Sequence, residues 1–192
     1  INQSNKTNKG VKSSRLLKKG LSSNKTNLSL FYNNKLEQFS RLEELITKWE
    51  IIINKNKDLD VSAFFLSLEN QVYADINPDR KLSAASSIKV PILTVLLKML
   101  DEGEIFWNEK LILTEDAIGS GSGWMAYQVI GKKFPVYEVA SEMIRVSDNT
   151  ATNLLIKRIG GINVVNQKFK EIGLKNTKIN NFLPDLSGTN LT

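Results

Sequence analysis

Two groups of residues in this sequence have the types and the spacing that nucleophilic catalysis requires. In the first group, Ser86 and Lys89 are three residues apart. On a helix this spacing places both side chains on one face, one turn apart. A serine in the first turn would lie among free N–H groups that stabilise a developing oxyanion. A neighbouring lysine can accept the serine proton when burial lowers its pKa. The pair therefore indicates a serine nucleophile with a lysine base.

The spacing alone also has a simpler interpretation. Ser22 and Lys25 share it within a polar stretch near the N-terminus. At Ser86 the alternative is a helix N-cap serine followed by a solvated lysine. Context separates the two pairs, because Ser86 follows two strand-like segments and precedes an apolar helix, and both interpretations of Ser86 stay open at this point.

The second group is Ser147-Asp148-Asn149. Such a sequence is common just before a helix, so the structural interpretation is that Asp148 caps the helix that follows it. In the functional interpretation, the Ser147 hydroxyl relays a proton toward a leaving group. The Asn149 amide would then hold either the substrate or Lys89.

Two residue types that hydrolases often use are missing from the sequence. The 192 residues include no Cys and no His. This excludes disulfides, thiolate metal sites and cysteine nucleophiles, and it excludes a Ser-His-Asp triad and histidine-bound zinc. A hydrolase with this sequence must take lysine or a carboxylate as its base, and we expect no metal or other cofactor.

The elements that position these residues follow from the hydrophobic periodicity. Apolar residues at spacings of three and four predict helices, and short β-rich runs predict strands. The glycines of residues 119–123 predict a loop. The expected helices span 33–54, 86–103, 138–145, 149–159 and 163–172, and the expected strand pair spans 61–68 and 71–75 with a turn at 69–70.

The positive charge of the chain lies in its first residues. The net charge is +6, yet residues 1–30 contain seven cations and no acid, which leaves 19 cations and 20 acids elsewhere. We interpret residues 1–32 as a basic flexible linker or tail, with an anion-attracted arm as the alternative. No aromatic residue precedes Phe31, so we expect no nucleic-acid partner. No apolar run reaches the roughly 18–20 residues that span a bilayer.

In this order, the two motifs resemble those of the class A β-lactamase and penicillin-binding serine hydrolase superfamily. The resemblance covers about residues 36–192. It is carried by Ala84-Ala-Ser-Ser-Ile-Lys-Val-Pro-Ile-Leu93, Asp101-Glu-Gly103, Gly121-Ser-Gly123, the run from Met143 to Leu155, and Ile172-Gly-Leu174 followed by Thr177.

The resemblance implies an α+β fold with two lobes, an antiparallel sheet flanked by helices and a mostly helical lobe, with the active site between them. It implies that Ser86 is the acylated nucleophile and Lys89 its general base. Ser147 would carry a proton to the leaving nitrogen, Asn149 would position the substrate, and Asp148 would be structural. The implied substrate is a β-lactam or a cell-wall peptide. The resemblance also implies a monomer located in the periplasm or otherwise outside the cytoplasm. A membrane anchor upstream of this sequence is compatible with it.

Two departures from the superfamily pattern shape the functional expectation. The Lys-Thr-Gly motif is absent, so residues 33–192 are expected to be the N-terminal portion of the hydrolase domain: the first two antiparallel strands and the helical lobe. The loop that carries a deacylating glutamate in efficient class A enzymes offers only Asp185, as a base or as a turn residue. We therefore expect hydrolysis of an amide or ester through acyl-Ser86. The alternatives are a D,D-peptidase or penicillin-binding protein that deacylates slowly, and a non-catalytic envelope protein.

Overall fold

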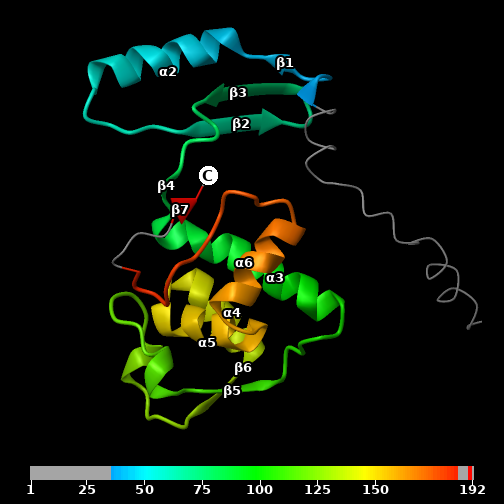
Figure 1. Cartoon of the computed structure of the whole chain (residues 1–192), viewed down its shortest axis with the longest axis vertical. Helices are drawn as coiled ribbons and strands as arrows, with labels where there is room; N and C mark the ends of the chain where they lie inside the picture. The colour runs from blue at the N-terminus through cyan, green and yellow to red at the C-terminus, as the bar shows by residue number, and fades with distance from the viewer. Residues whose placement is uncertain (1–35, 186–189, 192) are drawn as a thin grey trace, which may run out of the picture.

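The computed structural model describes residues 36–185 and 190–191. Its elements form two lobes, with a helix and a small sheet in one and a group of helices in the other (Figure 1). The α+β character and the two antiparallel strands expected from the sequence are confirmed. The predicted tail, residues 1–32, lies outside the described residues, and the domain boundary at residue 33 stays a prediction. The first lobe contains β1 (Ser40–Arg41), α2 (Glu43–Lys55), β2 (Ala63–Ser67) and β3 (Val72–Ile76).

The sheet of this lobe has the strand order β1-β3-β2. Strands β2 and β3 pair antiparallel, from Ala63 opposite Ile76 to Ser67 opposite Val72. The intervening turn is longer than the two residues expected. It ends at Gln71, which has a positive φ of 52°. The short β1 pairs with the other edge of β3 in the parallel direction.

The predicted helix over residues 33–54 is interrupted rather than continuous. Leu36 is helical, residues 37–39 form a turn, Ser40–Arg41 form β1, and helix α2 begins only at Glu43; residues 33–35 lie outside the described residues. The amide of Ser40 donates to the Gln71 carbonyl at 2.9 Å, and that of Leu42 donates to the Tyr73 carbonyl at 2.7 Å. These long-range bonds draw residues 40–42 onto the edge of β3, although their apolar spacing fits a helix.

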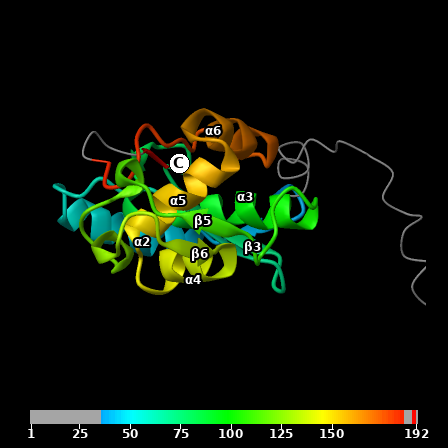
Figure 2. The ribbon, with the colours of Figure 1, turned by 90° about the horizontal axis from the view of Figure 1, so that it is seen from below.

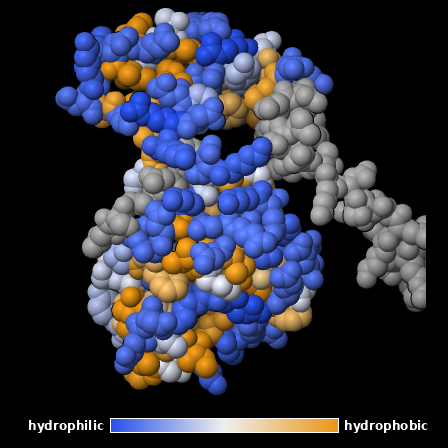
Figure 3. Space-filling model, in the orientation of Figure 1, coloured by the Kyte–Doolittle hydropathy of each residue, from blue (hydrophilic) through white to orange (hydrophobic). Residues whose placement is uncertain are grey.

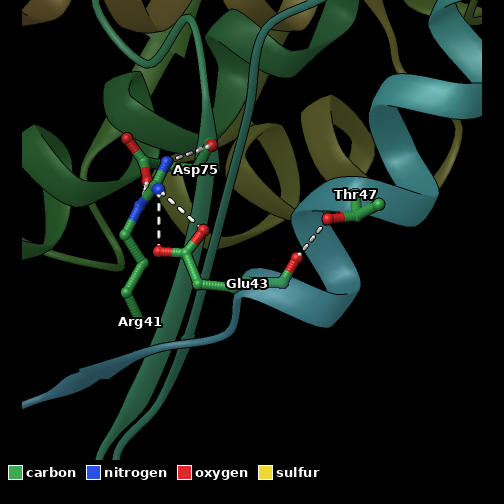
Figure 4. A network of polar contacts seen from close by, with 4 residues as sticks. All are labelled: Arg41, Glu43, Thr47 and Asp75. Carbon is green, nitrogen blue, oxygen red and sulfur yellow. Dashed lines mark hydrogen bonds and ion pairs between the residues drawn. The ribbon is translucent and has the colours of Figure 1, made fainter.

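An exposed ionic network joins this edge to the helix (Figure 4). The Arg41 guanidinium donates to Asp75 on β3 at 2.9 Å and to both carboxylate oxygens of Glu43 at 3.0 and 3.1 Å. The Thr47 hydroxyl donates to the Glu43 carbonyl one turn later at 2.9 Å. Because these contacts are exposed, the network adds little stability.

The second lobe is built around α5, which packs against α3, α4 and α6. Figure 2 shows α6 above α5 and α4 below it. The fully buried side chains of this core include Ile92, Leu96, Leu155, Ile156 and Phe169. All four helices predicted in this part of the sequence are confirmed, with starts and ends within a few residues. They are α3 (Lys89–Asp101), α4 (Val136–Arg145), α5 (Asn149–Ile159) and α6 (Ile162–Glu171).

Several short elements were not predicted. Strands β5 (Lys110–Ile112) and β6 (Lys133–Pro135) pair antiparallel, with β5 against α5 and β6 against α4. Strand β4 (Leu82–Ser83) pairs with β7 (Asn190–Leu191), which brings the last described residues beside the segment that leads to Ser86. The 3₁₀ turns η1 (Ala85–Ile88), η2 (Glu115–Ala117) and η3 (Met125–Tyr127) complete the lobe.

The surface of the helical lobe mixes apolar and polar side chains (Figure 3). A groove of about 500 Å³ between α3 and α4 is bordered by the exposed apolar residues Leu97, Trp107, Tyr137 and Ile144. None of the candidate catalytic residues lines this groove. Within the described ranges, no helix is both long enough and apolar enough to cross a bilayer.

Candidate active site

Ser86 lies in η1, the 3₁₀ turn that runs directly into α3. The preceding residue, Ala85, has a positive φ of 46°, which turns the chain sharply out of β4. Lys89 is the first residue of α3, and only 2% of its surface is exposed. Its Nζ lies 3.2 Å from Ser86 Oγ, so the one-turn spacing expected from the sequence becomes a direct contact.

The Ser147 turn brings a second hydroxyl to the same place. Lys89 Nζ donates to the Ser147 carbonyl at 2.6 Å and lies 2.8 Å from the Ser147 hydroxyl. It also donates to Asn149 Oδ1 at 2.9 Å, across 60 residues of sequence. Ser147 Oγ lies 2.9 Å from Ser86 Oγ. Ser86, Lys89, Ser147 and Asn149 therefore meet in one polar cluster, as they must if the proton of one serine is to reach the other through a lysine.

Burial lowers the pKa of Lys89, and the Asp148 carboxylate opposes this shift by favouring the ammonium form. Desolvation is the larger of the two effects. A lowered pKa enlarges the neutral fraction of the lysine, and only neutral lysine has the lone pair that accepts a serine proton. The environment of Lys89 thus suits it to act as a base.

Asp148 is 1% exposed, and its carboxylate is occupied by backbone amides. One oxygen accepts from Trp124 N at 2.7 Å and from Met125 N at 2.9 Å, and the other accepts from Ala151 N at 2.9 Å. The last bond caps α5, which confirms the structural interpretation of this residue. Gly123 packs so closely that an added Cβ would overlap the Asp148 side chain.

The amide of Asn149 is oriented from both ends. While Oδ1 accepts from Lys89, Nδ2 donates to the Ser120 carbonyl at 2.7 Å, and the Asn149 backbone N–H donates to Ser122 O at 3.1 Å. The glycine-rich loop of residues 119–123 therefore fixes which atom of Asn149 faces the lysine.

A pocket of about 180 Å³ opens beside Ser86. Asp185 lines it and is the one carboxylate among its lining residues, so the structure places this candidate within the same site. Asp185 Oδ1 also accepts from Asn181 Nδ2 at 3.1 Å. The lining residues are Ser83, Ala85, Ser86, Asn149, Leu183, Pro184 and Asp185.

One residue that positions this pocket was missed by sequence reasoning. Asn153 is completely buried and forms two hydrogen bonds with the backbone of Leu183. Its side chain donates to the Leu183 carbonyl at 2.8 Å and accepts from the Leu183 amide at 2.7 Å. Its Nδ2 also approaches the Ala117 carbonyl at 3.2 Å. The available signal was an asparagine one helical turn after Asn149, among apolar residues that predict burial.

The described residues contain no cluster of three or more potential ligands placed to hold a metal ion. The chemistry that the arrangement offers is proton transfer between a serine, a buried lysine and a second serine. That combination supports acyl transfer through Ser86.

Comparison with known proteins gives the same fold and superfamily. The β-lactamase BRO-1 of Moraxella catarrhalis is 29% identical over 165 residues, which are 82% of this chain and 51% of that protein. The D-alanyl-D-alanine carboxypeptidase DacF of Bacillus subtilis is 29% identical over 110 residues, 55% of this chain and 28% of that protein.

The solved structure of PBP-A is 36% identical with a TM-score of 0.78, and the match covers 80% of this chain and 58% of that one. A mutant of PBP-A, solved as an acyl-enzyme complex with penicillin G, superposes with a TM-score of 0.77.

The chain spans about half the length of two β-lactamases it matches, 51% of that from Moraxella catarrhalis and 53% of that from Bacillus licheniformis. The family model described as the beta-lactamase enzyme family matches residues 41–192. Those residues include both serine motifs and every element that positions them. On this match and on the shared fold, the chain belongs to the beta-lactamase enzyme family, within the superfamily of serine hydrolases that also includes penicillin-binding proteins.

Proposed function

We propose that this protein is an acyl-transferring serine hydrolase that forms an acyl-enzyme on Ser86. The observation that carries the proposal is the contact of Lys89 Nζ with both serine hydroxyls, at 3.2 Å for Ser86 and 2.8 Å for Ser147. Neutral Lys89 would take the proton of Ser86 as its oxygen attacks the carbonyl carbon of an amide or ester. Ser147 would pass a proton to the leaving nitrogen, and the Ser86 N–H would donate to the oxyanion.

The proposed substrates are β-lactams and peptides of the cell wall. Support comes from relatives named as β-lactamases and as a D-alanyl-D-alanine carboxypeptidase, and from the penicillin G acyl-enzyme of the PBP-A mutant. These substrates place the protein outside the cytoplasm, so we also propose a periplasmic or other extracytoplasmic location.

We further propose that deacylation is slow. Among the residues lining the pocket beside Ser86, Asp185 offers the carboxylate that can activate a water, and Leu183 fills the neighbouring wall. Asp185 Oδ1 already accepts a hydrogen bond from Asn181, which competes with a water for that oxygen. A long-lived acyl-enzyme distinguishes a penicillin-binding peptidase from a β-lactamase. The hydrogen bond to Asp185 therefore favours a penicillin-binding peptidase as the second candidate function.

The test is to incubate the full-length protein with a fluorescent penicillin and to locate the added mass by peptide mass spectrometry. We expect label on Ser86, no label in Ser86→Ala, and normal labelling in Ser141→Ala, which alters an exposed serine on α4 away from the pocket. Persistent label together with release of D-alanine from a peptide ending in D-alanyl-D-alanine identifies a peptidase. Rapid loss of label with penicillin hydrolysis identifies a β-lactamase, and a folded protein that takes no label refutes the proposal.

A further inference from the structure

Trp124 and Glu142 make a hydrogen bond beside the Ser147 turn that the acyl-transfer chemistry does not itself require. The Trp124 indole N–H donates to Glu142 Oε2 at 2.6 Å. The Glu142 side chain is only 9% exposed, and Arg145 donates to both of its oxygens at 2.7–3.1 Å. The indole ring also meets the edge of Phe134, with ring centres 5.9 Å apart. The contact is therefore held in place from several sides.

These two residues close a ring of hydrogen bonds with Asp148. The Asp148 amide donates to the Glu142 carbonyl at 3.1 Å, and the Trp124 amide donates to the Asp148 carboxylate at 2.7 Å. The indole bond from Trp124 to Glu142 completes the ring. It joins three segments: the last turn of α4, the loop after Gly123 and the start of α5. Ser147 lies in sequence between Glu142 and Asp148, so the ring spans the turn that carries it.

The Ser147 turn needs such support. Ser147 has a φ of 58°, a conformation that residues other than glycine keep only when their surroundings impose it. In this conformation its carbonyl and its hydroxyl both contact Lys89 Nζ, at 2.6 and 2.8 Å. A turn free to relax would move both oxygens and open the lysine to water.

We propose that Trp124 and Glu142 are positioning residues for the acylation of Ser86, acting by holding the Ser147 turn against Lys89. This inference rests on the proposed function. Neither side chain contacts Ser86 or Lys89 directly among the contacts described, so the effect must pass through Asp148 and Ser147. Because Arg145 neutralises the Glu142 carboxylate, the ring holds the turn without placing an unpaired negative charge near the lysine.

The experiment compares Glu142→Ala, Glu142→Gln and Trp124→Phe in the full-length protein. Gln keeps an oxygen that accepts from the indole, and Phe keeps the ring packed on Phe134 while it removes the N–H donor. The matched control is Glu109→Ala, which breaks a comparable ion pair with Arg158 on α5, with Nη2 and Oε2 2.9 Å apart. That pair has no bond to the Ser147 turn.

Three quantities are measured for each variant. They are the rate of acylation by a fluorescent penicillin, the midpoint of thermal unfolding, and the pKa of Lys89 followed by ¹³C NMR of the lysine Cε. Asp148 is the charged group that acts on Lys89, and every variant retains it. The NMR titration needs no acylation, so it reports on the turn even in a protein that penicillin does not label.

We expect Glu142→Ala and Trp124→Phe to acylate about 10- to 100-fold more slowly, the loss typical of a catalytic group displaced by about 1 Å. We expect the pKa of Lys89 to rise toward its ordinary value as water reaches it, and Glu142→Gln to lie closer to the parent. Glu109→Ala should lose thermal stability with acylation and titration unchanged. The inference is overturned if Glu142→Ala and Trp124→Phe lower the melting temperature yet leave the Lys89 titration as in the parent. A parent that titrates as expected but takes no label refutes the proposed function instead.

Discussion

Gly119→Ala is expected to damage the site through a steric clash that local sequence gives no reason to anticipate. Gly119 is buried where the glycine-rich loop of residues 119–123 packs against the backbone of Leu183. An added Cβ would overlap the Leu183 carbonyl oxygen and would lie 2.9 Å from Asn149 Cβ and 3.0 Å from Asn153 Nδ2. The nearest of these neighbours is backbone, so a simple rotamer change cannot relieve the contact.

The size of the effect follows from what the Cβ displaces. Forcing a methyl group into a packed site costs about 1–3 kcal/mol. Moving Leu183 O away from Asn153 Nδ2 breaks a buried bond of 2.8 Å, which costs about 1–3 kcal/mol more. We therefore expect the free energy of unfolding to fall by about 2–6 kcal/mol. For a chain of this size the melting temperature should fall by about 4–24 °C.

The assays are urea denaturation, thermal unfolding and amide hydrogen exchange at Leu183, whose N–H donates to Asn153 at 2.7 Å. Gly103→Ala is the matched control, since Gly103 has a φ of 77° and a Cβ there would meet no atom within 4 Å. Its cost is backbone strain alone, about 1–2 kcal/mol, and the exchange of the Leu183 amide should not change. Gly119→Ala with stability within about 1 kcal/mol of the parent and normal protection at Leu183 would refute the reasoning.

Three further predictions concern the full-length protein. Lys89→Ala should slow acylation by penicillin about 10²- to 10⁴-fold, the contribution of a general base, whereas Lys98→Ala, on the exposed end of the same helix, should acylate normally. Asn153→Ala and Asn166→Ala each remove a pair of bonds to one backbone residue, Leu183 and Ile179 respectively, so urea denaturation should show each to be destabilised by about 2–4 kcal/mol. Only Asn153→Ala should change the lifetime of the acyl-enzyme in a label-decay assay, because only Leu183 lines the pocket; equal lifetimes would contradict the role given to the Leu183 segment. Finally, the acylation rate measured against pH should rise as Lys89 loses its proton, with a midpoint below the ordinary lysine value of 10.5. Between the lowered pKa of folded Lys89 and 10.5 the unfolded chain binds more protons, so this residue makes the free energy of unfolding increase with pH in that window.

Much of the local structure could be predicted from the sequence because its causes are local. Helix α5 begins at Asn149 and ends at Ile159, where the Ser147-Asp148 junction and Gly160-Gly161 place its ends. Caps, apolar periodicity and glycine act over four residues or fewer, so a short window of sequence contains them. The one-turn spacing of Ser86 and Lys89 is of the same kind.

The errors came where distant segments compete with local preference. Residues 40–42 fit a helix by apolar spacing, yet they bond to the edge of β3 more than 30 residues away. The pairs β4 with β7 and β5 with β6 depend in the same way on strands too short to carry a sequence signal. Strand pairing of this kind gains its stability from partners that no local window contains.

By itself, the sequence determined which groups are available for chemistry: two serines, a lysine and an amide, with no histidine or cysteine to replace them. Only the tertiary structure decided that they meet. Lys89 and Ser147 are 58 positions apart in sequence, and packing of α3 against α5 brings them within hydrogen-bond distance. The same packing removes water from Lys89, and this desolvation is what lowers its pKa. The contacts and the lowered pKa of Lys89 come from burial and from packing across the fold, and neither follows from spacing along the chain.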